Sequence, residues 1–166
     1  PSLGNGGALY LQGSTFNFNG GTLSNNVANR YGGAINTNQG ATLNISGNCI
    51  ISGNKASHGG GISQEAGECS LTLNGAGIQI TNNEAHGHQV NISDSGVHSV
   101  TNNLGNGGGI FIEKGTVTMN GAKIKNNNAS GHVSGASLYV NRIHGRKTSV
   151  NIKGGEISNN SAQYGG

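Results

Sequence analysis

Apolar and polar residues alternate strictly in five short stretches of the chain. Alternation over so few residues is typical of a strand with one buried face. In each case a glycine or an Asn-Gly pair follows within about two residues and supplies the turn. The predicted strands are Phe16-Asn17-Phe18, Leu43-Asn44-Ile45, Leu71-Thr72-Leu73, Val117-Thr118-Met119 and Val150-Asn151-Ile152.

A second pattern consists of an apolar residue, two polar positions, an asparagine, a variable position and an alanine. Five copies in 166 residues are too many for chance. The copies are Leu23-Asn26-Ala28, Ile51-Asn54-Ala56, Ile80-Asn83-Ala85, Ile124-Asn127-Ala129 and Ile157-Asn160-Ala162.

Each copy is followed by a glycine-led head that opens another apolar stretch, and one further head lies near the start of the chain. The last head is cut short at Gly165-Gly166. The others are Gly6-Gly7-Ala8-Leu9, Gly32-Gly33-Ala34-Ile35, Gly59-Gly60-Gly61-Ile62, Gly107-Gly108-Gly109-Ile110 and the degenerate Gly135-Ala136-Ser137-Leu138.

The three patterns recur in a constant order with a period of about 27 residues. A fixed period between about 20 and 50 residues indicates a solenoid, propeller or array, and a propeller blade needs four strands over roughly 40 residues. No helical period is sustained. We therefore predict an all-β protein, a right-handed single-stranded parallel β-helix (solenoid), with about 27 residues and three short strands per coil and five to six coils.

Residues 1–166 are expected to form a single β-helix domain that is a segment of a longer repeat protein. Residues 86–106 interrupt the repeat as a loop insertion, and insertions in solenoids often lie on a binding face. Alternatively, 90–92 and 97–100 pair as a small hairpin. A second irregular segment, 141–148, lengthens the link before the last strand.

The asparagine of the second pattern is expected to form an amide ladder. Equivalent side chains stack on one another in successive coils, so each amide can donate to the next and satisfy groups that would otherwise be buried without a partner. The alanine two positions later is expected where the turn re-enters the core. The ladder residues are Asn26, Asn54, Asn83, Asn127 and Asn160.

The composition excludes several classes of protein. Apolar residues are 32% of the chain, below the usual 45–50% or so, but charged residues are only 9%, which is unlike a disordered chain. With aromatic residues at 4% and a net charge of +3, the chain has neither the stacking platform nor the basic stripe of a nucleic-acid binder. No apolar run approaches the 18 or so residues of a membrane span.

Candidate catalytic and metal-binding residues are sparse. Glycoside hydrolysis usually needs two carboxylates at a defined separation; Glu65 and Glu68 are the only close pair, and we expect no carboxylate on a neighbouring coil to complete a site. The chain is therefore expected not to be an enzyme and to need no cofactor. His86 and His88 form an H-x-H pair that suits Zn or Cu, although exposed loop histidines are the favoured interpretation.

Two kinds of covalent modification stay open. Cys49 and Cys69, the only cysteines, form either one disulfide between successive coils or two free thiols. Four N-x-S sequons are candidate glycosylation sites if the protein is secreted by a eukaryote. They lie at Asn44, Asn91, Asn128 and Asn159.

The repeated heads resemble a known surface-protein repeat. Gly32-Gly33-Ala34-Ile35 is similar to the GGAI motif of the chlamydial polymorphic outer membrane protein repeat. Phe16-Asn17-Phe18-Asn19 matches its FxxN partner, and the Leu/Ile-x-x-Asn pattern is similar to FxxN with an aliphatic residue in place of the aromatic one. The resemblance implies a right-handed parallel β-helix at a cell surface, as in autotransporter passenger domains and adhesin-like proteins.

The function expected is that of a non-catalytic cell-surface or extracellular scaffold, acting in adhesion or as a filament-forming stalk. Its expected partners are further coils of the same protein or other copies stacked end to end, and host or neighbouring cell-surface proteins or glycans. The alternative is a polysaccharide-active enzyme or glycan-binding module. An ice-binding β-helix is disfavoured because Thr116-Val117-Thr118 is an isolated Thr-x-Thr triplet.

Overall fold

The computed structural model describes residues 4–87, 105–141 and 147–165, and in these residues all regular structure is β-strand. The strands form three parallel sheets, named here A, B and C. Sheet A contains β1 (Leu9–Gln12), β4 (Ile35–Asn38), β8 (Ile62–Gln64), β12 (Ile110–Ile112) and β15 (Leu138–Val140). Sheet C contains β7 (Lys55–Ala56), β11 (Glu84–Ala85), β14 (Asn128–Ser134) and β17 (Ser161–Tyr164).

Sheet B is the largest and receives two strands from each coil. In its first half lie β2 (Thr15–Phe18), β5 (Thr42–Ser46) and β9 (Cys69–Asn74). In its second half lie β3 (Gly21–Ser24), β6 (Cys49–Ser52) and β10 (Gln79–Thr81). The two halves merge in β13 (Gly115–Lys125) and β16 (Thr148–Ser158), which run through both without interruption.

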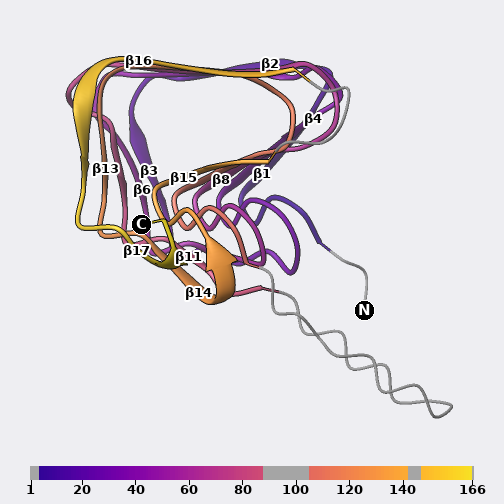
Figure 1. Cartoon of the computed structure of the whole chain (residues 1–166). Coiled ribbons are helices and arrows are strands. Elements are labelled where there is room, and N and C mark those ends of the chain that lie inside the picture. Colours follow the sequence, from indigo (N-terminus) through magenta and orange to yellow (C-terminus); the bar gives the residue numbers. More distant parts are fainter. Residues whose placement is uncertain (1–3, 88–104, 142–146, 166) are drawn as a thin grey trace, which may run out of the picture.

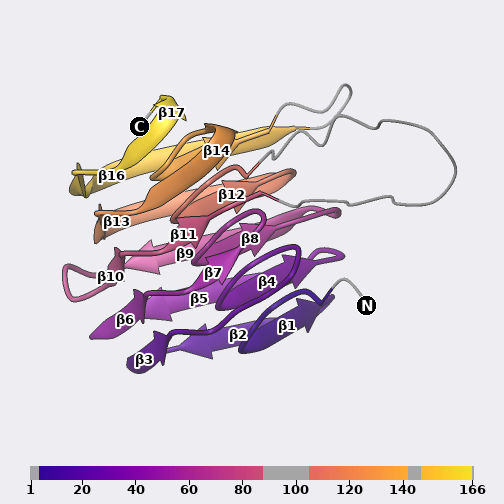
Figure 2. The same cartoon turned by 90° about the horizontal axis from the view of Figure 1, so that it is seen from below.

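The register confirms the predicted solenoid. Ile35 pairs with Ile62, which is 27 residues later, and Ile62 pairs with Ile110 beyond the insertion. The five strands of sheet A are thus separated by about four turns of the chain, and Figure 2 shows these levels stacked in order from β1 to β16. The predicted three strands per coil are found in the coils that contain β13 and β16, where the two strands of sheet B are fused. The second and third coils have four strands each, because a short strand of sheet C is added to two separate strands of sheet B. The right-handed winding stays a prediction.

Seen along the stack, the sheets surround the apolar core (Figure 1). Sheet B forms two walls that meet at a corner, and sheet A closes the third side. The alternating residues meet inside: Leu43, Leu71 and Val117 stack in register and are buried. Because each apolar side chain packs on its equivalents one coil away, a chain with few apolar residues can fill this core.

The segments that follow sheet C curl against the outer side of sheet A (Figure 1). A small second stack of alanines joins sheet C to these segments: Ala85, Ala129 and Ala162 lie in register in sheet C, and Ala136, between β14 and β15, packs with them. This position is the predicted re-entry point of the alanine. The outer side of sheet A is therefore not a free surface, and Asn36, on its outward side, is completely buried.

The glycine heads are explained by two different constraints. Gly32 has a φ of +64°, in the region that L side chains rarely adopt. Gly33 has an ordinary φ, but a Cβ there would collide with the carbonyl oxygen of Gly60 in the next coil. The first glycine therefore turns the chain, and the second allows adjacent coils to approach.

The insertion leaves and re-enters the stack at one place. The amide of Gly87 donates to the carbonyl of Ser57 (3.4 Å), and a Cβ on Gly105 would collide with the nitrogen of Gly87. The two ends of the insertion therefore lie side by side, which leaves the coil uninterrupted. The predicted hairpin of 90–92 and 97–100 lies outside the described residues.

Candidate functional site

The predicted asparagine ladder is confirmed. In each step the Nδ2 of one asparagine donates to the Oδ1 of its equivalent in the next coil, over 2.9 to 3.0 Å. The same Oδ1 also accepts the backbone N–H of the preceding asparagine. The ladder connects Asn26, Asn54, Asn83, Asn127 and Asn160 in that order.

Each ladder side chain also secures the coil before it. Asn83 Nδ2 donates to the carbonyl of Ile51, and Asn127 Nδ2 donates to that of Ile80. Asn54, Asn83 and Asn127 are at most 1% exposed, so the ladder satisfies buried polar groups. These amides are fully engaged in holding coils together, and the ladder is structural.

A column of left-handed residues beside the ladder was not predicted. The residue before each ladder asparagine has a φ between +55° and +64°. Asparagine and glycine are the residues that adopt this conformation most readily. The column is formed by Asn25, Gly53, Asn82, Asn126 and Asn159. The signal in the sequence was the Asn-Asn or Gly-Asn pair, in which the first residue makes the corner and the second makes the ladder.

The disulfide alternative for Cys49 and Cys69 is wrong, and both thiols are free and buried. Cys49 begins β6 and pairs with Gly21, whereas Cys69 begins β9 and pairs with Gly115. The two cysteines belong to successive coils but lie at different corners of the coil, so they do not stack on each other. Cys49 Sγ donates to the carbonyl of Ser46 (3.0 Å), and burial raises the pKa of its thiol.

The candidate metal site is not assembled from described residues. His86 is exposed beside the insertion and its amide donates to the carbonyl of Ala56, while His88 lies outside the described residues. In the part of the chain that the structure describes, no three His, Cys, Asp or Glu side chains come together to hold a metal ion.

The candidate glycosylation sites occupy different environments. Asn44 is in the middle of β5, and its Nδ2 donates to Asn17 Oδ1 (2.9 Å), so the acceptor nitrogen is engaged. Asn128 and Asn159 are exposed. Asn91 lies outside the described residues.

The expectation that no carboxylate recurs on a neighbouring coil is wrong. Glu113 follows β12 just as Glu65 follows β8, and its amide donates to the carbonyl of Gln64 (2.8 Å). Neighbouring strands are about 4.8 Å apart, so the two carboxylates come from adjacent backbone positions. Glu68, the partner suggested by the sequence, is instead largely exposed and lies 3.8 Å from Lys114.

Glu65 is the centre of a polar cluster. Its Oε1 accepts hydrogen bonds from Asn36 Nδ2 (2.7 Å) and Asn5 Nδ2 (3.1 Å), which reach it from the two preceding coils. Burial raises the pKa of Glu65, and Glu113 acts in the same direction, whereas Asn36 and Arg30 oppose it. The Oδ1 atoms of Asn36 and Asn5 have no hydrogen-bond partner among the described residues.

An aromatic row adjoins this cluster on the outer side of sheet A. Tyr31 stacks on His58 with ring centroids 5.2 Å apart, and His58, Phe111 and Tyr139 continue the row. The Arg30 guanidinium lies 4.7 Å above the Tyr31 ring. Phe111 is only 3% exposed, so the row mainly joins the curled segments to sheet A.

The outward side of the first half of sheet B carries hydroxyl and amide side chains along most of its length, and the exposed Lys153 of β16 lies at its edge beside Asn120. One row along the stack contains only hydroxyls: Thr15, Thr42, Ser70, Thr116 and Ser149. The next contains Asn17, Asn44, Thr72, Thr118 and Asn151. A third contains Ser46, Asn74 and Asn120. We call these three rows the hydroxyl–amide face.

The sequence pattern did not reveal this face. Only Thr116-Val117-Thr118 is a Thr-x-Thr triplet, but the register places it between Ser70-Leu71-Thr72 and Ser149-Val150-Asn151. Each of these triplets has its apolar residue inside and two small polar residues outside. The signal was available as [Thr/Ser]-x-[Thr/Asn] in five copies rather than as Thr-x-Thr.

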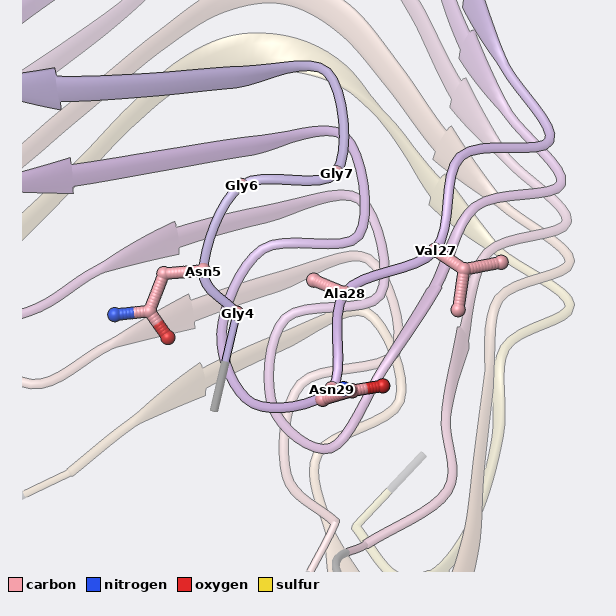
Figure 3. Close-up of a pocket in the computed structure, with 7 residues that line it drawn as sticks. All are labelled: Gly4, Asn5, Gly6, Gly7, Val27, Ala28 and Asn29. Atoms are coloured by element: carbon pink, nitrogen blue, oxygen red, sulfur yellow. The ribbon is translucent and has the colours of Figure 1, made fainter. Parts of the chain in front are cut away.

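A pocket of about 210 Å³ opens at the first coil (Figure 3). It is bounded by Gly4 to Gly7 on one side and by Val27 to Asn29 on the other. Its lining consists of glycines, small apolar residues and two asparagines and contains no ionisable side chain, so it presents no group for acid–base chemistry.

No helix within the described residues has the length and hydropathy needed to cross a lipid bilayer. Comparisons with family models, curated proteins and solved structures find no match to this chain.

Proposed function

We propose that this chain is part of a non-catalytic β-solenoid scaffold that acts outside the cell or at its surface, in adhesion or as a structural stalk. The observation that carries the proposal is the hydroxyl–amide face, an extended surface contributed by successive coils, beside which Lys153 is the one ionisable residue on the described outward positions of the first half of sheet B. A surface assembled by repetition suits contact with an extended partner.

Two further features support a scaffold. The conspicuous repeated asparagines are engaged in coil-to-coil hydrogen bonds rather than directed at a ligand. The resemblance of Gly32-Gly33-Ala34-Ile35 to the chlamydial surface-protein repeat implies a location at the cell surface.

The partners proposed are further coils of the same protein or a second copy stacked end to end, together with proteins or glycans of a neighbouring or host cell. The ladder joins one coil to the next through the same amide contact at every step, and stacking of equivalent coils from two copies would use that contact again. Sedimentation of the chain over a range of concentrations tests end-to-end stacking, and a concentration-independent monomer would argue against it.

Adhesion is tested by coupling the chain to beads and measuring their retention on epithelial and bacterial cell layers. Beads that carry the native chain should be retained more than beads that carry the urea-unfolded chain. Equal retention of the two on every layer would contradict an adhesive role.

A polysaccharide-active enzyme is the second candidate, and the pair Glu65 and Glu113 favours it. Retaining glycosidases use two carboxylates about 5 Å apart, and Glu65 and Glu113 start from adjacent backbone positions of neighbouring coils. Release of reducing ends from a panel of polysaccharides, abolished by Glu65→Gln and by Glu113→Gln, would support this candidate. No release by the native chain would leave the scaffold as the better proposal.

A further inference from the structure

The hydroxyl–amide face repeats in two directions. Neighbouring strands of a sheet are about 4.8 Å apart, and side chains on one side of a strand recur about every 6.6 Å. The alternation of buried and outward residues in β5 and β9 directs Thr42, Asn44, Ser70 and Thr72 to the outside. A ligand laid across the coils therefore meets a similar set of hydroxyls and amides at each step.

The groups on the face both donate and accept hydrogen bonds. Asn44 Nδ2 donates to Asn17 Oδ1, and Asn120 Nδ2 donates to Asn74 Oδ1 (3.0 Å). These lateral bonds fix the amides in position, and each NH2 group has a second hydrogen for a ligand. Preorganised side chains lose less conformational entropy when they bind.

The chemistry of the face excludes most classes of macromolecular ligand. Nucleic acid requires several lysines and arginines for its phosphates, and a membrane surface requires clustered basic or apolar side chains. The three rows contain neither, and Lys153 at their edge is a single positive charge. Protein interfaces usually depend on aromatic or arginine anchors at their centre, which are also missing here. A neutral ligand rich in hydroxyl groups remains.

We infer that the hydroxyl–amide face binds a neutral polysaccharide laid along the stack. This inference rests on the proposed adhesive function and gives it a ligand class. One hydrogen bond contributes only about 1 kcal/mol net, but a polymer that spans several coils engages several equivalent rows at once, and linked contacts of this kind raise the affinity far above that of a single one.

Co-sedimentation with insoluble cellulose, chitin and β-1,3-glucan tests the inference, with alginate gel as the anionic comparison. The native chain should bind at least one of the neutral polymers. The double variant Thr72→Ala/Thr118→Ala removes two hydroxyls that pair at the centre of the face. Its dissociation constant should rise about thirtyfold, as expected from two lost hydrogen bonds.

The matched control is Thr22→Ala/Gln79→Ala. These side chains are exposed and lie on β3 and β10, in the other half of sheet B. The control should bind like the native chain, and equal urea midpoints will show that both double variants are folded. Equal loss in the two double variants, or binding to alginate alone, would overturn the inference.

Two further outcomes separate this inference from the proposed function. If native beads adhere to cells but the chain binds no neutral polysaccharide, the ligand class is wrong and the adhesive function stands. If the chain binds no polysaccharide but inhibits ice recrystallisation, and Thr72→Ala/Thr118→Ala abolishes that inhibition, the face binds ordered water instead and the inference fails.

Discussion

At the scale of single residues, each of the three internal ladder asparagines is hydrogen-bonded to three neighbours. Asn83 Oδ1 accepts the N–H and the Nδ2 of Asn54, and its own Nδ2 donates to Asn127 and to the carbonyl of Ile51. Glutamine would carry the same groups on a longer side chain, and aspartate would place a charge in a buried site.

We predict that Asn83→Ala lowers the free energy of unfolding by about 3–5 kcal/mol, since each buried polar group left without a partner costs roughly 1–3 kcal/mol. Urea denaturation followed by circular dichroism measures the loss. Asn120→Ala is the control, because it removes an exposed amide ladder step and should cost less than about 1 kcal/mol. Similar losses in both variants would contradict the special role of burial.

Two glycines allow the cost of an unfavourable backbone conformation to be measured separately from the cost of a steric clash. Gly40 has a φ of +77°, and no atom lies within 4 Å of the position that a Cβ would occupy, whereas Gly33 has an ordinary φ and no space. We predict that Gly40→Ala costs about 1–2 kcal/mol, and that Gly33→Ala costs more because adjacent coils must separate. The urea midpoints of the two variants give the comparison. A Gly33→Ala variant that is more stable than Gly40→Ala would contradict the prediction.

At the scale of elements, a residue at the start or end of a strand stacks only on the residues that hold the same position in the other coils. Cys49 and Cys69 illustrate this, because both begin a strand of sheet B yet belong to different halves of it. Similar spacing from a turn therefore does not bring two residues of successive coils together. Only equivalent positions of the coil stack.

We predict that both thiols react with an alkylating reagent only when the chain is unfolded, since they are 0% and 1% exposed. Mass spectrometry after alkylation in buffer and in urea measures this directly. A mass change on reduction of the native protein would show a disulfide and contradict the free, buried thiols.

The end of sheet A provides a prediction about pH. Burial raises the pKa of Glu65, so the folded chain binds its proton more tightly than the unfolded chain does. The free energy of unfolding therefore falls as pH rises from the ordinary glutamate pKa of about 4.3 through the raised value. Glu65→Gln removes this effect while it keeps an acceptor for Asn36.

Glu65→Gln should accordingly gain stability relative to the native chain at pH 7, and the difference should vanish below about pH 4. Urea midpoints across this range measure the difference. Glu68→Gln is the control, since that side chain is 84% exposed. A difference that grows as the pH falls would mean that the Glu65 pKa is lowered rather than raised.

At the scale of the whole molecule, burial increases toward the middle of the stack. Leu43 and Leu71 are at most 1% exposed, whereas Ile152, on the last level, is 51% exposed. Because each coil is stabilised by its two neighbours, a coil with one neighbour has less of the stacking energy.

We predict that amide hydrogens of β5 and β9 exchange more slowly than those of β2 and β16. Hydrogen exchange followed by mass spectrometry of the 166-residue chain measures the gradient. Uniform protection along the chain would indicate that the stack unfolds as one cooperative unit.

The local sequence accounts for most of the repeat. The Asn-x-Ala pattern identified the ladder and the alanine column, and the glycine heads identified the turns, because in a solenoid every coil gives its residues the same environment. Alternation in Leu43-Asn44-Ile45 was sufficient to assign the inside and outside of a strand. These features depend on neighbours in sequence or on equivalent positions one period away.

Other features depended on the folded chain. The pairing of Glu65 with Glu113 crosses the insertion, so its spacing of 48 residues bears no relation to the period. The separation of Cys49 from Cys69 and the formation of the hydroxyl–amide face are set by register. The sequence by itself determined a parallel solenoid and its internal ladder, because those are periodic. Only the tertiary structure decided which side chains meet on its outer surfaces, because register and insertions place residues there that no fixed spacing connects.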